Sequence, residues 1–378
     1  MKFLNRDKTI INSENIATVL VLIFGIVFPF FGTTYHVNLF SNFYASILLC
    51  FSLTLIWGYC GIFSFAQAAL YGLGAYLYGI FAGNMPSPAY TPLALLLAVV
   101  IVWLFSIVLG YFMFYGGVND VFIGIITLCL TLALNTFFGQ TAGTKWTVGN
   151  VAIGGYNGMV GIPTLTIGNF TLMGLPFYYL TFALAAITLL FFNHLRHTKA
   201  GYTMFAIREN KERSEMFGYN APKIQMIVFS VGGAMAAIAG VLYASWGGYV
   251  SPDVMNTTQA TVPVIVVAAG GKASPVAAMI FGLIYYYVTN GFAATGNEYS
   301  FVILGIALIL VTLFMPQGLF KSLFDLLDSK FFSRIKAFKT NNVEKKNKIE
   351  PVRKVDSTDK IASKEEIVHV RRKSECTS

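Results

Sequence analysis

Long apolar stretches separated by short polar loops repeat along most of this 378-residue chain. A helix needs about 20 mostly apolar residues to cross the hydrocarbon core of a bilayer, and many of these stretches have that length. The pattern predicts membrane-embedded segments at 17–32, 39–58, 64–83, 91–115, 120–138, 175–193, 224–246, 259–271, 274–291 and 299–315. We therefore expect an all-α integral membrane protein, a bundle of about nine or ten transmembrane or re-entrant helices.

The segment 259–271 differs from the others. Its apolar core runs only from Val262 to Ala269, which is too short to cross a bilayer alone, and Gly270-Gly271-Lys272 follows it. Non-helical backbone at membrane depth is tolerated where it is buried in protein or lines a cavity. We therefore expect a broken or re-entrant element packed against other helices.

Basic residues divide the loops into two groups. The long loop 139–174 contains only Lys145, whereas the loop 194–223 is rich in Lys and Arg. Cytoplasmic loops carry the excess of basic residues, so this rule places 194–223 in the cytoplasm and 139–174 outside. Alternation of the spans then places 1–16 inside as a cytoplasmic N-terminus, followed by a transmembrane domain at 17–319. Both chain termini are predicted to be cytoplasmic.

The long apolar stretches end at Pro316, and charged residues become frequent after it. Apolar residues recur at helical spacing over 320–339 with Lys and Arg between them, which predicts an amphipathic helix lying on the lipid of the inner leaflet. Residues 340–378 are mostly charged and polar, which is typical of a disordered cytoplasmic tail. Of the 26 Lys and Arg residues, 15 lie in 321–378, so the transmembrane part is almost uncharged.

Composition narrows the class of function. With 56% hydrophobic and 11% charged residues, the chain is far from a soluble domain, and its net charge of +9 lies beside spans and in the tail rather than on a nucleic-acid-binding face. The four His and four Cys residues are dispersed and form no metal-spaced or catalytic cluster. We expect a transport protein without a metal site or nucleic-acid partner, and not an enzyme.

The source of energy is predicted to lie outside the chain. No Asp, Glu, His or Arg of the body falls in the middle of a predicted span, which argues against coupling to an ion gradient. The run Gly270-Gly271-Lys272 is not a nucleotide-binding P-loop, because Val266 stands where that motif needs Gly. If transport is driven by ATP, separate subunits must bind and hydrolyse it.

Small residues are dense between Trp57 and Tyr76, and close helix packing is the default explanation for them. A second interpretation is that helix breaks at Gly58 and Gly61 lie near a pore. In that case the polar groups of three residues about one helical turn apart would contact a passing solute. These candidate residues of the substrate pathway are Ser64, Gln67 and Tyr71.

The cytoplasmic loop 199–223 is predicted to form a polar helix outside the lipid, ending near Gly218. Its apolar residues could dock it on a partner or on its own pore, and its charged residues support i,i+4 pairs on an exposed face. A solvated charged helix is the alternative. The apolar set is Met204, Ile207, Met216 and Phe217, and the charged set is Arg208, Glu209, Glu212 and Arg213.

The external loop contains turn-forming sequence with little charge between Thr144 and Thr166. It could contact an external binding protein or cover a pore mouth, and a structural connector is an equally good interpretation.

Three stretches together resemble the permeases of the branched-chain amino acid ABC importer family, in particular the LivM-type subunit and related urea and short-chain amide permeases. They run from Trp57 to Tyr76, from Tyr156 to Pro163 and from Ala206 to Asn220. Further landmarks follow in the family's order, at 234–243, 251–252, 270–271 and 314–319. The chain departs from the family pattern at Ala66, where a Gly is usual, in the loop 115–122, and in the long tail.

The resemblance implies a permease that pairs with a second permease as a heterodimer, two cytoplasmic ATPase subunits and an extracytoplasmic solute-binding protein. ATP and Mg²⁺ would be bound by the ATPases, so no cofactor is expected in this chain. The matched stretch makes Ala206, Arg208, Glu209 and Gly218 the expected ATPase-coupling residues. The location implied is the bacterial inner membrane.

Branched-chain amino acids are the first expected substrate, and urea or short-chain amides are the alternative. A secondary transporter or channel is the more distant alternative.

Overall fold

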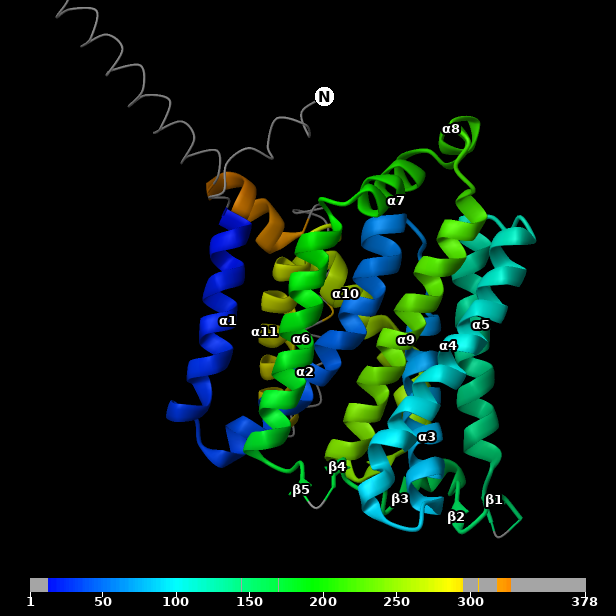
Figure 1. Cartoon of the computed structure of the whole chain (residues 1–378), viewed down its shortest axis with the longest axis vertical. Coiled ribbons are helices and arrows are strands. Elements are labelled where there is room, and N and C mark those ends of the chain that lie inside the picture. Colours follow the sequence, from blue (N-terminus) through cyan, green and yellow to red (C-terminus); the bar gives the residue numbers. More distant parts are fainter. Residues whose placement is uncertain (1–12, 144, 169, 295–304, 306–317, 328–378) are drawn as a thin grey trace, which may run out of the picture. The chain divides into compact units, whose positions relative to one another are not determined.

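The computed structural model describes residues 13–143, 145–168, 170–294, 305 and 318–327 (Figure 1). All of these except Leu327 belong to one unit, residues 1–326. The long helices are α1 (Ser13–Phe31), α2 (Thr34–Leu53) continued by the π-helical η1 (Thr54–Tyr59), α3 (Ala66–Asn84), α4 (Thr91–Tyr115), α5 (Asp120–Gln140), α6 (Leu175–Leu195), α9 (Ala221–Gly247) and α11 (Pro275–Ala294).

Shorter elements connect these helices. Helical ones are the 3₁₀ turns η2 (Pro88–Tyr90), η3 (Gly155–Asn157) and η4 (Pro252–Met255), and the helices α7 (Lys199–Glu209), α8 (Lys211–Met216) and α10 (Thr257–Gly270). The strands are β1 (Thr147–Val148), β2 (Val151–Ala152), β3 (Met159–Val160), β4 (Thr166–Ile167), β5 (Phe170–Thr171) and β6 (Tyr249–Val250). They form three antiparallel pairs, β1 with β2, β3 with β6, and β4 with β5.

Seven of the described helices are long and apolar enough to cross a membrane, namely α1, α2 with η1, α4 with η2, α5, α6, α9 and α11. The predicted all-α integral membrane fold is thereby confirmed. The predicted span 299–315 lies outside the described residues apart from Gly305, as do the N-terminal residues 1–12 and the predicted tail 340–378. Of the predicted amphipathic helix 320–339, residues 320–327 are described and are helical.

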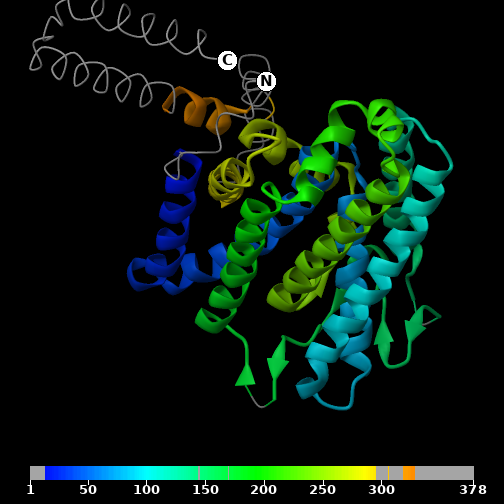
Figure 2. The same cartoon turned by 45° about the horizontal axis from the view of Figure 1, so that its top comes forward.

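The connecting elements gather at the two ends of the helical bundle. Figure 1 shows α7 and α8 at one end and the three strand pairs at the opposite end, and Figure 2 shows the same separation from another side. We call these the α7–α8 end and the hairpin end. Charge follows the same division: the α7–α8 end carries Arg196, Arg208 and Lys272, whereas the described part of the 139–174 loop, at the hairpin end, has Lys145 as its basic residue.

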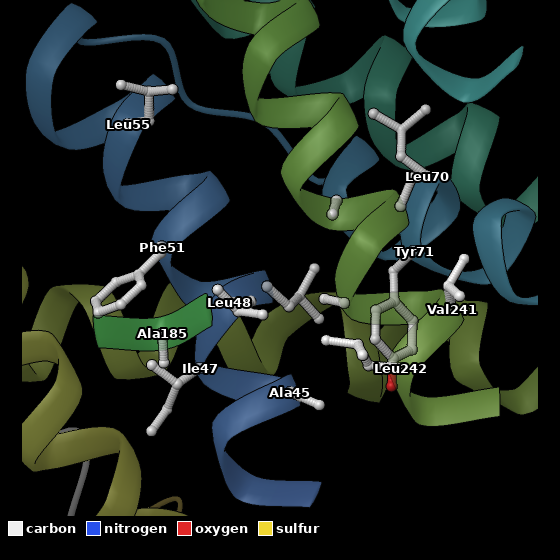
Figure 3. Close-up of a cluster of buried hydrophobic side chains, with 14 of the residues drawn as sticks. Ala45, Ile47, Leu48, Phe51, Leu55, Leu70, Tyr71, Ala185, Val241 and Leu242 are labelled. Atoms are coloured by element: carbon white, nitrogen blue, oxygen red, sulfur yellow. The ribbon is translucent and has the colours of Figure 1, made fainter. Parts of the chain in front are cut away.

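Helix α9 lies at the centre of the bundle and packs against α2, α3 and α4. Glycines permit this packing: a Cβ at Gly74 would meet the backbone of Ala237, and one at Gly240 would meet the carbonyl oxygen of Tyr71. Such small-residue contacts are the usual interface between helices in membranes. Figure 3 shows part of the resulting core, in which Tyr71 lies beside Leu242.

An ion cluster joins three segments that are far apart in the sequence. At the start of α1, the Glu14 carboxylate accepts hydrogen bonds from Arg196, at 2.6 Å, and from Lys321. The cluster is partly buried, with the Glu14 side chain 12% exposed. It ties α1 and the 319–327 helix to the base of the α7–α8 loop.

Gly240→Ala should destabilise the protein, because the new methyl group would meet the Tyr71 carbonyl of α3 and force the two helices apart. Overpacking of this kind costs about 1–3 kcal/mol. Gly247→Ala is the matched control in the same helix, since a Cβ there would meet nothing within 4 Å. Thermal unfolding of the detergent-solubilised protein measures both, and equal stability of the two variants would contradict the close α3–α9 contact.

Candidate functional site

The first break in the helical bundle follows α2. Helix α2 widens into the π-helical η1, and residues 61–65 are not helical before α3 begins at Ala66. Gly61 adopts a φ of +80°, a left-handed conformation that favours glycine and turns the chain out of the helix. Of the two breaks that the sequence analysis considered, the one at Gly61 is present, whereas Gly58 lies within η1. The break belongs to the interior of the bundle because Ile62 and Ser64 are each only 1% exposed.

Helix α5 satisfies the backbone of this break with two side chains one turn apart. The Phe65 N–H donates to the Thr127 hydroxyl at 3.1 Å. The Thr131 hydroxyl shares its one proton between the Phe65 carbonyl, at 3.1 Å, and the Thr127 carbonyl of its own helix, at 2.8 Å. Both threonines are buried, at 1% and 0% exposure. One further turn along α5, Asn135 donates from Nδ2 to the Pro252 carbonyl at 2.7 Å. Thus one polar stripe on an apolar helix supports two separate segments that depart from the α-helix, residues 61–65 and the 3₁₀ turn η4.

The α7–α8 end holds the other side of the same break. Arg208 of α7 donates from Nη1 to the Gly58 carbonyl, and a Cβ at Gly61 would meet the Arg208 side chain and backbone. Carbonyls at the end of a helix lack partners within the helix and carry partial negative charge, so a cation is favourable there. Arg208 therefore caps the end of η1.

Lys272, in the turn between α10 and α11, lies against the same helix end. Its Nζ stands 4.3 Å from the ring centroid of Trp57, and a Cβ at Gly58 would meet its carbonyl oxygen. Burial, reinforced by the positive charge of Arg208, lowers the pKa of Lys272 below its usual range. The repulsion between the positive charges of Arg208 and Lys272 is offset here by the negative end of the helix dipole and by the Trp57 ring.

The structure divides the predicted coupling residues into two groups. All four are exposed, but Arg208 also donates a hydrogen bond to η1, whereas Ala206, Glu209 and Gly218 have no such contact with that segment among the hydrogen bonds of the described residues. Gly218 has a φ of +88° and ends the turn after α8.

The apolar residues of the same loop divide in the same way. In α7, Ile207 is 3% exposed, and Phe205 stacks on Tyr59 with ring centroids 4.9 Å apart. In contrast, Met216 is 85% exposed and Phe217 is 76% exposed. Helix α7 is therefore anchored on the bundle, and the end of α8 projects from it.

The predicted substrate-pathway residues Ser64, Gln67 and Tyr71 are all inside the core, at 1%, 1% and 6% exposure. Gln67 accepts a hydrogen bond from the Ser52 hydroxyl at 2.9 Å, and its Nε2 has no hydrogen-bond partner among the described residues. The Tyr71 ring lies 5.7 Å from that of Tyr243. In this conformation the three residues therefore lie at packed positions inside the bundle, as the packing interpretation expects.

Sequence reasoning missed the stripe of Thr127, Thr131 and Asn135. Its signal was present as polar residues at i, i+4 and i+8 within an apolar helix, which place them on one face. Threonine in membrane helices commonly bonds to its own helix, so the spacing alone does not reveal a bond to another segment. Among residues 13–143, 145–168, 170–294 and 318–327, no group of three or more His, Cys, Asp or Glu residues could hold a metal ion.

These features define a class of protein: a multi-pass membrane protein with broken helices in its interior and a short charged helical loop fixed to one of the breaks. Residues 35–312 match the family model described as the branched-chain amino acid transport system permease component. The chain belongs to this permease family.

Curated relatives agree with the family. The high-affinity branched-chain amino acid transport system permease protein LivM of Escherichia coli (strain K12) is 29% identical over 142 residues, covering 38% of this chain and 33% of that protein. LivH of the same strain is 27% identical over 288 residues, covering 72% of this chain and 90% of that protein.

A third relative has a different named cargo. The autoinducer 2 import system permease protein LsrD of Photorhabdus temperata is 27% identical over 209 residues, covering 52% of this chain and 58% of that protein. The chain thus spans a third of the length of the LivM protein that it matches. No solved structure matches this chain.

Thr131→Val should destabilise the bundle, because it keeps the shape of the side chain and removes the hydroxyl that bonds to the part-buried Phe65 carbonyl and to the Thr127 carbonyl. An unsatisfied buried polar group costs about 1–3 kcal/mol. Thr136→Val, at an exposed position of the same helix, is the control and should change little. Thermal unfolding in detergent measures the difference, and the absence of any difference would show that the Thr131 hydroxyl does not hold Phe65.

Proposed function

We propose that this chain is the permease subunit of an ATP-binding-cassette importer that carries branched-chain amino acids across the bacterial inner membrane by alternating access. The observation that carries the proposal is the α7–α8 loop. One end of the loop is anchored on a break in α2 through Arg208, and the other end exposes Met216 and Phe217 outside the apolar bundle. Exposed aromatic and Met side chains are typical of contact sites for a partner protein.

The proposed mechanism separates docking from transmission. An ATPase subunit docks on Met216, Phe217 and the charged face that includes Glu209. Its movement on binding ATP displaces α7, and the Arg208–Gly58 contact passes the displacement to the end of α2. The ATPases supply the bound ATP and Mg²⁺, and this chain supplies no catalytic group to the hydrolysis.

The remaining partners follow from the same proposal. A second permease subunit completes the pore as a heterodimer, two ATPases bind at the α7–α8 end, and a solute-binding protein delivers cargo at the hairpin end. The concentration of Arg and Lys at the α7–α8 end supports a cytoplasmic position for that end and for both termini. The family match and the LivM and LivH relatives support the choice of cargo.

Urea or a short-chain amide is the alternative cargo of the same kind of importer. A secondary transporter or channel is a more distant alternative, in which ion gradients replace the ATPases.

ATP-dependent uptake tests this function. The chain is co-expressed with the second permease, ATPase and binding-protein genes encoded beside it, and the purified complex is reconstituted in liposomes. We expect labelled leucine to enter only when the ATPase side has ATP and Mg²⁺ and the binding protein is present. Uptake of urea or acetamide instead of leucine would show that the importer carries the alternative cargo. The importer proposal would be overturned if this chain alone took up leucine and an ionophore abolished that uptake.

Replacing the exposed docking residues should separate assembly from folding. The double variant Met216→Ser, Phe217→Ser is expected to lose most of the copurifying ATPase while keeping the thermal stability of the wild type, because these side chains do not pack on the bundle. Phe170→Ser, which removes an exposed aromatic ring at the hairpin end, is the matched control and should retain the ATPase. Full retention by the double variant would refute docking at this loop.

Gln67→Leu tests whether the buried polar residues ever contact solute. Folding should tolerate this change, because the Ser52 hydroxyl still has the Leu49 carbonyl as an acceptor at 2.7 Å. If the Gln67 amide binds solute in another conformation, loss of one hydrogen bond should raise KM for leucine by about tenfold, equivalent to 1.4 kcal/mol. Uptake kinetics in liposomes measure KM, and an unchanged KM would leave Gln67 a packing residue.

A further inference from the structure

The chain between α9 and α10 returns into the bundle from the hairpin end. Strand β6 pairs Val250 with Met159, which lies against Gly79 of α3. Met255, a few residues later, lies against Gly72 of the same helix. The separation from Gly79 to Gly72 is two turns, so the chain descends by about 10 Å at a rise of 1.5 Å per residue.

Helix α10 therefore begins inside the bundle. Gly72 lies twelve residues before the end of α3 at Asn84, which places Met255 about 18 Å below that end. The Asn135–Pro252 hydrogen bond fixes the same segment to α5. From Thr257, α10 runs for 14 residues to Gly270, beside the Lys272 turn at the α7–α8 end. With a length of about 21 Å, it spans only part of a bilayer.

The first turn of α10 exposes polar side chains at this depth. Thr257, Thr258 and Gln259 are all exposed, although Met255 just before them and Ala260 just after them are buried, at 0% and 3%. Asp253, on the preceding turn, is exposed as well. Lipid tails offer no hydrogen bonds, and an amide or hydroxyl left unsatisfied in hydrocarbon costs several kcal/mol. A carboxylate costs more still.

We propose that the first turn of α10, with Thr257, Thr258 and Gln259, forms one wall of a water-filled solute path whose opposite wall is the second permease subunit. This inference rests on the proposed function, because a path along the outside of one subunit needs a partner to close it. The wall offers hydroxyl and amide groups that both donate and accept hydrogen bonds. Such groups suit a small zwitterionic or neutral polar solute, because neither of its charges meets a fixed charge of the same sign on these three side chains.

The location distinguishes this wall from the polar residues of α3. Ser64, Gln67 and Tyr71 are enclosed by α2 and α9 and would need helix separation to reach solute, whereas the α10 turn is open in this conformation. The short helix also links the wall to the coupling end. Its last turn leads directly to Lys272, whose backbone lies against Gly58 of η1.

Thiol accessibility tests the wall. Thr258→Cys is introduced into the complete reconstituted complex after Cys129, which is exposed, and Cys376 have been replaced by Ser. The probe is a membrane-impermeant, positively charged methanethiosulfonate, which reacts with a thiolate and therefore needs water at the site. Leu104→Cys, on the exposed apolar surface of α4, is the matched control.

We expect Thr258→Cys to react about tenfold faster than Leu104→Cys or more, because thiolate forms only where water reaches the sulfur. Leucine with the binding protein and ATP should slow that reaction. Reaction as slow as at the α4 control would overturn the proposal. The proposal would also be overturned if the thiol reacted fast in the isolated chain and binding of the second permease left that rate unchanged. The partner would then not close the path.

A second readout separates this inference from the proposed function. Thr258→Val should raise KM for leucine several-fold with thermal stability unchanged, and Thr258→Ser should restore it. If uptake depends on ATP while the Thr258 thiol is unreactive, the wall is wrong and the importer stands. If the thiol is reactive and uptake does not depend on ATP, the water-filled path is supported and the importer proposal is wrong.

Discussion

The structure depends on one constraint: backbone that leaves the helical state inside an apolar bundle must still have its hydrogen bonds satisfied. Among the residues that the structure describes, two such interior segments depart from the α-helix, residues 61–65 after η1 and the 3₁₀ turn η4 before α10. Helix α5 supports both through Thr127, Thr131 and Asn135, and Arg208 supports the first from the α7–α8 end. The same helix thus holds both segments, so α5 is the structural link between them.

Helices α9 and α3, in contrast, are held together by close packing and not by hydrogen bonds from the described side chains. Where Gly74 meets Ala237 and Gly240 meets Tyr71, the helices approach until backbone lies against backbone, and no polar side chain is needed to hold them. A bundle of this kind has a rigid centre, formed by α9 with α2, α3 and α4, and weaker elements where helices are interrupted. Conformational change is expected at the interruptions, because packed interiors resist gradual deformation.

The sequence predicted the membrane-spanning architecture well, because hydropathy and helix length report directly on a bilayer. It also offered the break at Gly61 as one interpretation and predicted the short segment 259–271, whereas Gly58, the other predicted break, lies within η1. It could not assign Arg208, since a cation on an exposed-looking helix can point to solvent, to a partner or back to its own bundle, and only the fold brings Gly58 beneath it. The α5 stripe was equally hidden, because its partners, Phe65 and Pro252, are distant in sequence and are backbone groups.

The anchoring of α7 limits how the proposed transport cycle can work. Phe205 and Ile207 pack on the bundle, and Arg208 holds the Gly58 carbonyl, so a push on α8 cannot be absorbed by free rotation of α7. The segment next in line is η1, where the π-helical hydrogen bonds interrupt the regular α pattern, a feature that recurs at functional sites. Lys272 contacts that segment from the other side and is continuous with α10. Displacement of η1 would therefore reach the polar first turn of α10 without passing through the tightly packed α3–α9 contact.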